Sequence, residues 1–339
     1  MIKHLRSKLA AATVIAAIAF SMSTAHAQQK SEIALSRQPG IFYMPSHIME
    51  KLKLIEKHAA SLGVSGVTTK WITFSGGGAQ TDALLAGGVD ILNTGTGNLL
   101  LLWDRTRGGV KGIVATSAQP MTLISRDANI KSIRDFGPGD KIAVPTVKVS
   151  TQAIVLQIAA AEAFGADQWS KLDANTVQLG HPDAYAALSN PKHEVHNHFS
   201  IPPFTFLELK NVPGAHVVLS SPDVMGGPLS QAQFFTTTKF ADANPKIIQA
   251  VRDATKEAQD LIRSDTKQAV EIYREITGDK TSVQELLDLL KEPGMMEWNL
   301  EPQGTMKFAA HLYKTGTLKH QPKAWTDYYL PVAHDLKGN

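Results

Sequence analysis

The sequence predicts an α/β protein with two lobes, each a mostly parallel sheet flanked by helices, followed by a helical C-terminus. Strand-like and helix-like segments alternate from residue 32 to about 220, with short glycine-rich links, as in parallel βαβ units. One strand–turn–helix–strand unit occurs twice, at 71–91 and at 177–196. The chain of 339 residues exceeds one typical core, which also favours two lobes.

The first two thirds supply the strands and their connecting helices. Short runs rich in β-branched and apolar residues predict strands at 32–37, 67–74, 89–92, 110–116, 121–125, 141–144, 177–179, 194–199 and 216–219. Apolar residues at helical spacing, ended by Gly63, Gly87 or Gly165, predict helices at 45–62, 79–86, 98–107 and 150–164.

The last third is predicted to be helical. Asn244-Pro245 is an N-cap followed by proline at the first helical position, and an apolar stripe follows it. Asp265 is placed to cap a second helix, and Ser282 and Glu285 have the capping-box spacing for a third. The late aromatic residues, from Trp298 onward, are expected to pack this tail.

The first 27 residues have the three parts of a secretory signal peptide. Three cations precede an apolar run at 9–20, and Ala25-His26-Ala27 forms a small-x-small cleavage pattern. The run is about half of the ~20 residues that a membrane helix needs. We expect a cleaved signal peptide at 1–27 and an exported, soluble mature chain.

Charge and cysteine content exclude several classes of protein. The chain has 34 Lys and Arg against 31 Asp and Glu, and the leader holds three of those cations, so the mature chain is formally neutral. A nucleic-acid partner is therefore not expected. The complete lack of cysteine excludes disulfides, thiolate metal sites and a cysteine nucleophile.

Polar loops at predicted helix starts are the candidate ligand contacts. Their glycines let backbone N–H groups approach a guest, and a helix N-terminus favours negative charge. No Gly-Lys-Ser/Thr follows, so this is not a phosphate-binding P-loop. The alternatives are plain turns and, for Lys148, a surface cation. The candidates are Gln38, Gly76, Gly77, Gly78, Thr94, Gly95, Thr96, Lys148, Ser150 and Thr151.

Four histidines lie within eighteen residues: His181, His193, His196 and His198. On a strand, His193 would face away from the other two, so neither a metal site nor a cofactor is expected. His181 and His198 lie nearer the expected ligand and are candidate hydrogen-bond donors. Catalytic motifs are lacking as well: no Gly-x-Ser-x-Gly occurs, and the Ser189-x-x-Lys192 spacing contains a proline. We therefore expect no enzyme activity.

The order of several motifs resembles periplasmic solute-binding proteins of ABC importers. The similarity is to the nitrate/sulfonate/taurine-type family, which is related to binding proteins for thiamine-pyrimidine precursors. The motifs are Gln38-Pro-Gly-Ile-Phe42, Phe74-Ser-Gly-Gly-Gly78, Asp82–Asp90, Ile142-Ala-Val-Pro145, Ser150-Thr151, His198–Phe204 and Val224-Met-Gly-Gly227.

This resemblance implies a hinged, two-lobed fold of the type II periplasmic binding proteins, and it adds Phe204 to the ligand contacts. One lobe would comprise 28–120 plus 239–339, the other 121–238. The implied function is capture of a small organic anion, a sulfonate or a carboxylate, for delivery to the transmembrane permease. Alternatives are a precursor pyrimidine or other heteroaromatic ligand, an enzyme on the same fold, a histidine-based metal carrier and a sensor subunit.

Overall fold

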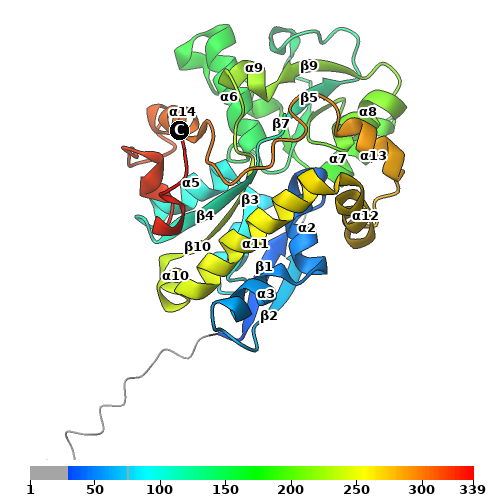
Figure 1. Cartoon of the computed structure of the whole chain (residues 1–339). Helices are drawn as coiled ribbons and strands as arrows, with labels where there is room; N and C mark the ends of the chain where they lie inside the picture. Colours follow the sequence, from blue (N-terminus) through cyan, green and yellow to red (C-terminus); the bar gives the residue numbers. More distant parts are fainter. Residues whose placement is uncertain (1–29, 75) are drawn as a thin grey trace, which may run out of the picture. The chain divides into compact units, whose positions relative to one another are not determined.

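The computed structural model describes residues 30–74 and 76–339. The predicted signal peptide and Ser75 lie outside the described residues. From residue 31 to the C-terminus the chain forms one compact unit that contains two five-stranded sheets (Figure 1). In this part of the chain no helix combines the length and apolar character that a membrane crossing requires.

The first sheet has the strand order β2-β1-β3-β10-β4. β1 pairs in parallel with both β2 and β3, whereas β10 is antiparallel to β3 and β4, so one strand opposes the other four. The strands are β1 (Glu32–Arg37), β2 (Thr68–Thr73), β3 (Ile91–Gly95), β4 (Val110–Ser117) and β10 (Ala232–Thr237).

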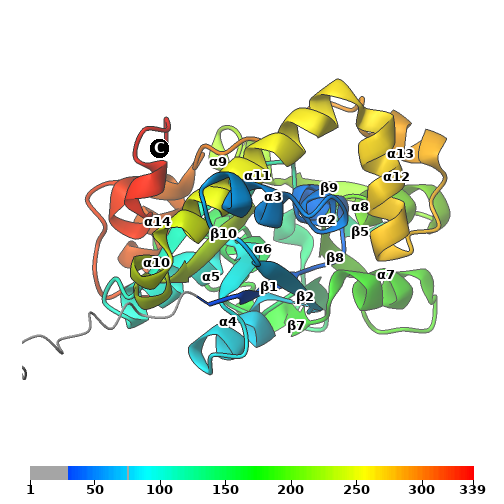
Figure 2. The same cartoon turned by 60° about the horizontal axis from the view of Figure 1, so that its bottom comes forward.

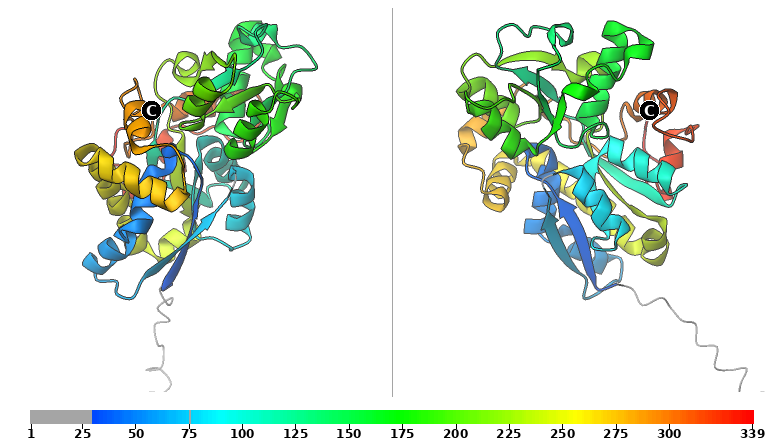
Figure 3. Two further views of the ribbon diagram at one scale, coloured as in Figure 1. Left: turned by 90° about the vertical axis from the view of Figure 1, so that its right-hand side faces the viewer. Right: turned by 180° about the vertical axis from the view of Figure 1, so that it is seen from behind.

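The second sheet has the strand order β7-β6-β8-β5-β9 and again one opposing strand, β5, in the fourth position. Figure 3 shows the green segments of this sheet gathered together. Its strands are β5 (Thr122–Ser125), β6 (Ile142–Val144), β7 (Thr176–Gln178), β8 (Asn197–Ser200) and β9 (His216–Ser220). The predicted repeat is confirmed, because its two strands occupy the first and third positions of each sheet.

The predicted helices are present with one break, whereas the helices at 204–211, 221–225 and 238–243 and the strand β10 have no predicted counterpart. They are α2 (Met44–Lys51), α3 (Leu54–Ser61), α4 (Gly77–Leu85), α5 (Thr96–Arg105), α6 (Thr151–Phe164), α7 (His181–Ser189), α8 (Phe204–Asn211), α9 (Ser221–Met225), α10 (Thr238–Ala243), α11 (Pro245–Ser264), α12 (Thr266–Thr277), α13 (Val283–Leu289) and α14 (Thr305–Lys314). The single helix predicted at 45–62 is wrong: Lys53 adopts a left-handed conformation with φ 50° and separates α2 from α3.

Of the C-terminal helices, α11 and α12 pack on the first-sheet helices α2 and α3, whereas α14 contacts α6. α11 lies along α2 and α3 on one face of the first sheet, while α4 lies on the other (Figure 2). The predicted caps of α12 and α13 are confirmed: Asp265 accepts a hydrogen bond from the Gln268 backbone, and Ser282 and Glu285 form a capping box. Asn244 precedes α11 but makes no side-chain capping bond.

Strand pairing refines the expected division into lobes. The segment 121–238 was assigned to the second lobe, yet β10 lies within the first sheet, between β3 and β4. The chain thus passes to the second sheet between β4 and β5 and returns between β9 and β10. The lobe boundaries remain a prediction, and we place the second boundary before Ala232.

Candidate ligand-binding site

Five of the described helices begin at residues that line one small cavity. Tyr43 precedes α2, Gly77 opens α4, Gly95 precedes α5, Ser150 precedes α6 and His181 opens α7. Each helix follows a strand that has a parallel neighbour, and the carboxyl ends of such strands are where α/β proteins bind ligands. The lining is Gln38, Tyr43, Gly77, Thr94, Gly95, Asn98, Pro145, Ser150, Thr151, Gln152, His181 and Gln231.

Glycines allow the loops of the two sheets to meet at this cavity. A Cβ on Gly95 would lie 2.6 Å from Thr151 Oγ1, and one on Gly97 would lie 2.3 Å from the Val149 carbonyl oxygen. In both cases the glycine lies at the end of β3 or the start of α5, on the first-sheet side, and its neighbour lies after β6, on the second-sheet side. The cavity is accordingly only about 10 Å³, which holds about one water molecule. The structure therefore shows the two sets of loops in close contact.

The first-sheet side of the cavity is a hydrogen-bonded group of neutral side chains. Gln38 Nε2 donates to Tyr43 Oη at 2.9 Å and to Thr94 Oγ1 at 3.0 Å. Burial raises the pKa of Tyr43, against the opposing effect of a side-chain hydrogen bond with Gln231, so its hydroxyl keeps its proton. Gln231 Oε1 is buried and has no hydrogen-bond partner in the described structure.

The second-sheet side places a histidine at the cavity. Gln152 Nε2 lies 3.3 Å from His181 Nε2, and the other ring nitrogen of His181 lies 2.8 Å from His198 Nε2. Phe204 stacks on the His181 ring, with 6.0 Å between the ring centroids and 19° between their planes. Burial, and next the neighbouring His198, lower the pKa of His181. The hydroxyl of Thr151 is buried without a hydrogen-bond partner among the described atoms.

The sequence-predicted residues divide into two groups. Those that line the cavity are Gln38, Gly77, Thr94, Gly95, Ser150, Thr151 and His181. The others surround the cavity. Gly76 and Gly78 approach Pro145 and Thr146, and Thr96 forms hydrogen bonds with the Ser230 carbonyl and with Gln233. Lys148 is exposed in a left-handed turn, and His198 and Phe204 contact His181 on the side away from the cavity. Whether any of these residues binds a ligand remains a prediction.

Five lining residues were missed by the sequence analysis: Tyr43, Asn98, Pro145, Gln152 and Gln231. Asn98 and Gln152 lie within two residues of predicted contacts, so extending each loop into the following helix would have found them. Gln231 carries no such signal, because it reaches the cavity only through the return of the chain into β10.

The cavity attracts negative charge without a cation. Among its described lining residues none is Lys, Arg, Asp or Glu. Each helix N-terminus carries roughly half a positive charge and unsatisfied N–H groups, which favour an anion. In residues 30–74 and 76–339 no group of three or more His, Cys, Asp or Glu side chains is arranged so that it could hold a metal ion.

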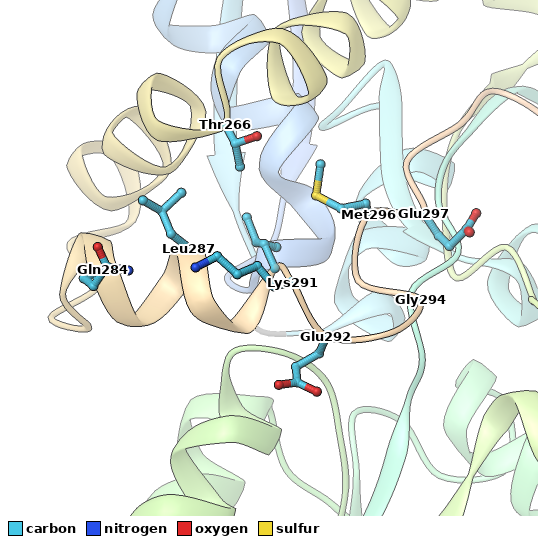
Figure 4. Close-up of a pocket in the computed structure, with 9 residues that line it drawn as sticks. Thr266, Gln284, Leu287, Lys291, Glu292, Gly294, Met296 and Glu297 are labelled. Carbon is cyan, nitrogen blue, oxygen red and sulfur yellow. The ribbon is translucent and has the colours of Figure 1, made fainter.

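A larger cavity lies elsewhere among the described residues and lacks these features. It is about 700 Å³ and is lined by residues of α12, α13 and the loop that follows. Leu287 and Met296 flank it in Figure 4. Lys291 in its lining pairs with Asp288, and no described residue of the lining has a buried polar side-chain atom without a hydrogen-bond partner. It is an open surface groove.

Comparisons identify the fold. No protein-family model and no curated protein matches the sequence. A Candida albicans gene product described as having the generic periplasmic binding protein fold matches with a TM-score of 0.64 and 12% identity, over 88% of this chain and 96% of that one. The chain has the periplasmic binding protein fold.

Two further solved structures share this fold. The alkanesulfonate-binding protein SsuA from Xanthomonas axonopodis pv. citri, bound to MOPS, matches with a TM-score of 0.68 and 16% identity, over 92% of this chain and 99% of that one. The nitrate-binding protein NrtA from Synechocystis PCC 6803 matches with a TM-score of 0.67 and 14% identity, over 91% and 89%. The predicted periplasmic binding protein fold is confirmed, and identities this low establish no more than the fold.

Proposed function

We propose that this protein is the substrate-binding component of an ABC importer and captures a small organic anion, a sulfonate or a carboxylate, in the cavity between the two sheets. The observation that carries the proposal is the meeting of five helix N-termini with unpartnered buried polar side chains. A fold neighbour that binds alkanesulfonates supports an organic anion, and one that binds nitrate supports an anionic ligand in general. The protein would act in the periplasm as a monomer, deliver its ligand to the permease and catalyse no reaction.

Neutral donors favour an organic anion over nitrate. Thr151 Oγ1 is free to donate, and the amides of Gln38 and Gln152 reach the same cavity. Such donors bind a sulfonate or carboxylate oxygen individually, and the apolar remainder of an organic ligand adds burial energy that nitrate lacks.

Binding would require the loops of the two sheets to separate and close again. A cavity that holds about one water molecule is too small for an organic anion. The hinges would be the two segments that connect the sheets, one after β4 and one after β9. A ligand that contacts both sides stabilises the closed form over the open one, and this difference in affinity moves the hinge equilibrium.

Native mass spectrometry of protein purified without denaturation tests the proposal, because a co-purified ligand would be identified directly. Calorimetric titration of stripped protein with propanesulfonate, taurine, benzoate, nitrate and a hydroxymethylpyrimidine follows. Binding of a sulfonate or carboxylate, without turnover, supports the proposal. Binding of the pyrimidine alone favours the heteroaromatic alternative, and a folded, stripped protein that binds none of these compounds refutes the proposed ligand class.

A further inference from the structure

A buried carboxylate stands behind the cavity, connected to it by two histidines. His198 Nδ1 lies 2.5 Å from Glu208 Oε1, and both side chains are fully buried. His198 Nε2 lies 2.8 Å from His181 Nδ1, and His181 Nε2 faces Gln152 at the cavity. The second carboxylate oxygen of Glu208 has no partner among the described atoms. We call Gln152, His181, His198 and Glu208 the relay.

The hydrogen bonds of the relay determine where its protons are. The Gln152 amide nitrogen can only donate, so His181 Nε2 accepts and His181 Nδ1 carries the proton. That proton is donated to His198 Nε2, and His198 Nδ1 then carries a proton that it donates to the Glu208 carboxylate. Both histidines are neutral in this state, and the relay has one net negative charge.

Adding one proton to the relay changes His181 Nε2, the atom at the cavity, from a hydrogen-bond acceptor into a donor. A proton accepted at His181 Nε2 makes that atom a donor, and the Nδ1 proton of His181 passes to His198 Nε2. His198 becomes an imidazolium beside Glu208, so the positive charge rests against the buried carboxylate and not at the N-terminus of α7, where a cation is disfavoured. The Gln152 amide rotates to release His181 Nε2.

We propose that Glu208 and His198 are positioning residues that make His181 take up one proton when an anionic ligand binds, so that the ligand and a proton enter the site together. This inference rests on the proposed function and specifies its ligand as an anion. The gain in hydrogen bonding is direct, because an accepting His181 Nε2 would repel the oxygen of a sulfonate or carboxylate, whereas a donating one binds it.

No other described charge competes for this proton within the elements packed around the relay. β5, β6 and β8 contribute no ionisable side chain other than His198. The remaining ionisable groups point to solvent or are partly exposed: Asp183 and Tyr185 on α7, Lys210 on α8, which pairs with Glu285, and Glu162 near the end of α6.

The protonation state can be read without any ligand by NMR of protein labelled with ¹⁵N-histidine. At pH 7.5 we expect His181 and His198 both to carry the proton on Nδ1, and a proton on Nε2 of either residue overturns the relay. With saturating propanesulfonate we expect His181 to carry a proton on Nε2 and His198 to become charged. Calorimetry in phosphate and in Tris, whose ionisation enthalpies differ, should give an uptake of about one proton for each propanesulfonate bound.

A matched pair of carboxylate variants separates the relay from general effects of charge. In the wild type, coupled proton uptake should weaken the affinity above neutral pH by up to about tenfold per pH unit. Glu208→Gln should abolish both the proton uptake and this pH dependence of the affinity. Glu285→Gln, the same change at an exposed position on α13, should keep both. If Glu208→Gln does not fold, His198→Gln serves in its place, and the wild-type measurements stand without either variant.

The outcomes also separate this inference from the proposed function. Propanesulfonate that binds to the wild type without proton uptake overturns the inference and leaves the function standing. If none of the compounds binds, the proposed function fails, and the ligand-free spectra alone decide whether the relay holds its protons as stated.

Discussion

Replacing Gly97 by alanine should weaken ligand binding by preventing close contact between the loops of the two sheets. Gly97 lies in the first turn of α5, and its added Cβ would stand 2.3 Å from the Val149 carbonyl oxygen and 2.8 Å from Ile154 Cδ1. Real Cβ contacts are essentially never closer than 3.0 Å, so the backbone of the second-sheet loop must retreat by at least about 0.7 Å.

The size of the effect follows from the cost of inserting a methyl group into a packed contact. Such overpacking costs about 1–3 kcal/mol, which corresponds to a loss of about 5- to 150-fold in affinity. The cost falls on the closed arrangement, because Gly97 and Val149 belong to segments that follow strands of different sheets and would separate in the proposed hinge opening. The free energy of unfolding should therefore fall by less than the binding free energy.

The assay is calorimetric titration with the anion that the wild type binds, together with urea denaturation of ligand-free protein. Gly139→Ala is the control, because this residue lies outside the cavity lining and its Cβ would meet no atom within 4 Å. Alanine there should leave affinity unchanged and change the free energy of unfolding by less than about 1 kcal/mol. Equal affinity of Gly97→Ala and wild type would refute the reasoning, as would an equal loss in both variants.

Three further predictions concern stability and the site. Gly112→Ala should lower the free energy of unfolding by about 1–3 kcal/mol in urea denaturation, because its Cβ would lie 2.6 Å from the buried Tyr329 ring; an unchanged value would contradict this packing. Thr151→Val should leave the free energy of unfolding unchanged and weaken anion binding about tenfold, since the lost hydroxyl has no partner among the described atoms and would bond only to the proposed ligand. A loss of stability would show that the hydroxyl has a partner in the protein. Burial, and then nearby Arg37, lower the pKa of His47 from 6.5 to about 3. On acidification below pH 6.5 only the unfolded state therefore gains this proton, and the free energy of unfolding falls by about 1.4 kcal/mol per pH unit. His47→Gln should reduce the slope of the free energy of unfolding against pH by that amount, and an unchanged slope would mean that His47 titrates normally.

Much of the fold could be predicted because local signals agreed with the tertiary structure. The strand–helix alternation, the Ser282 capping box and the repeated unit all survive in the structure. The break between α2 and α3 could not be predicted, because Lys53 in a left-handed conformation has no sequence signature of the kind that glycine supplies. The place of β10 could not be read either, because its partners β3 and β4 are more than a hundred residues away in the chain.

The site was predicted where it is made of strand-to-helix loops and missed where side chains reach it from the protein interior. Ser150 and Thr151 stand at a helix start that hydroxyl residues mark in the sequence. The sequence predicts that His198 contacts the ligand; in the structure its ring lies behind His181, and the ligand contact stays a prediction. Glu208 was not selected at all, because a single glutamate within an apolar helix looks like a solvent-facing residue until its burial is known.

The use of helix N-termini in place of a lysine or arginine has a consequence for ligand release. Each N-terminus attracts an anion only within about its first turn, so the attraction of the helices on one side is lost as soon as the loops of the other side move away. A fixed surface cation would keep part of its attraction in the open form and slow release. The shared strand order of the two sheets places such helix starts on both sides, after β1, β2 and β3 in one sheet and after β6 and β7 in the other. The proposed anion would then be held tightly only while both sides are in contact, which is the property that an importer needs from a carrier that must also give up its cargo.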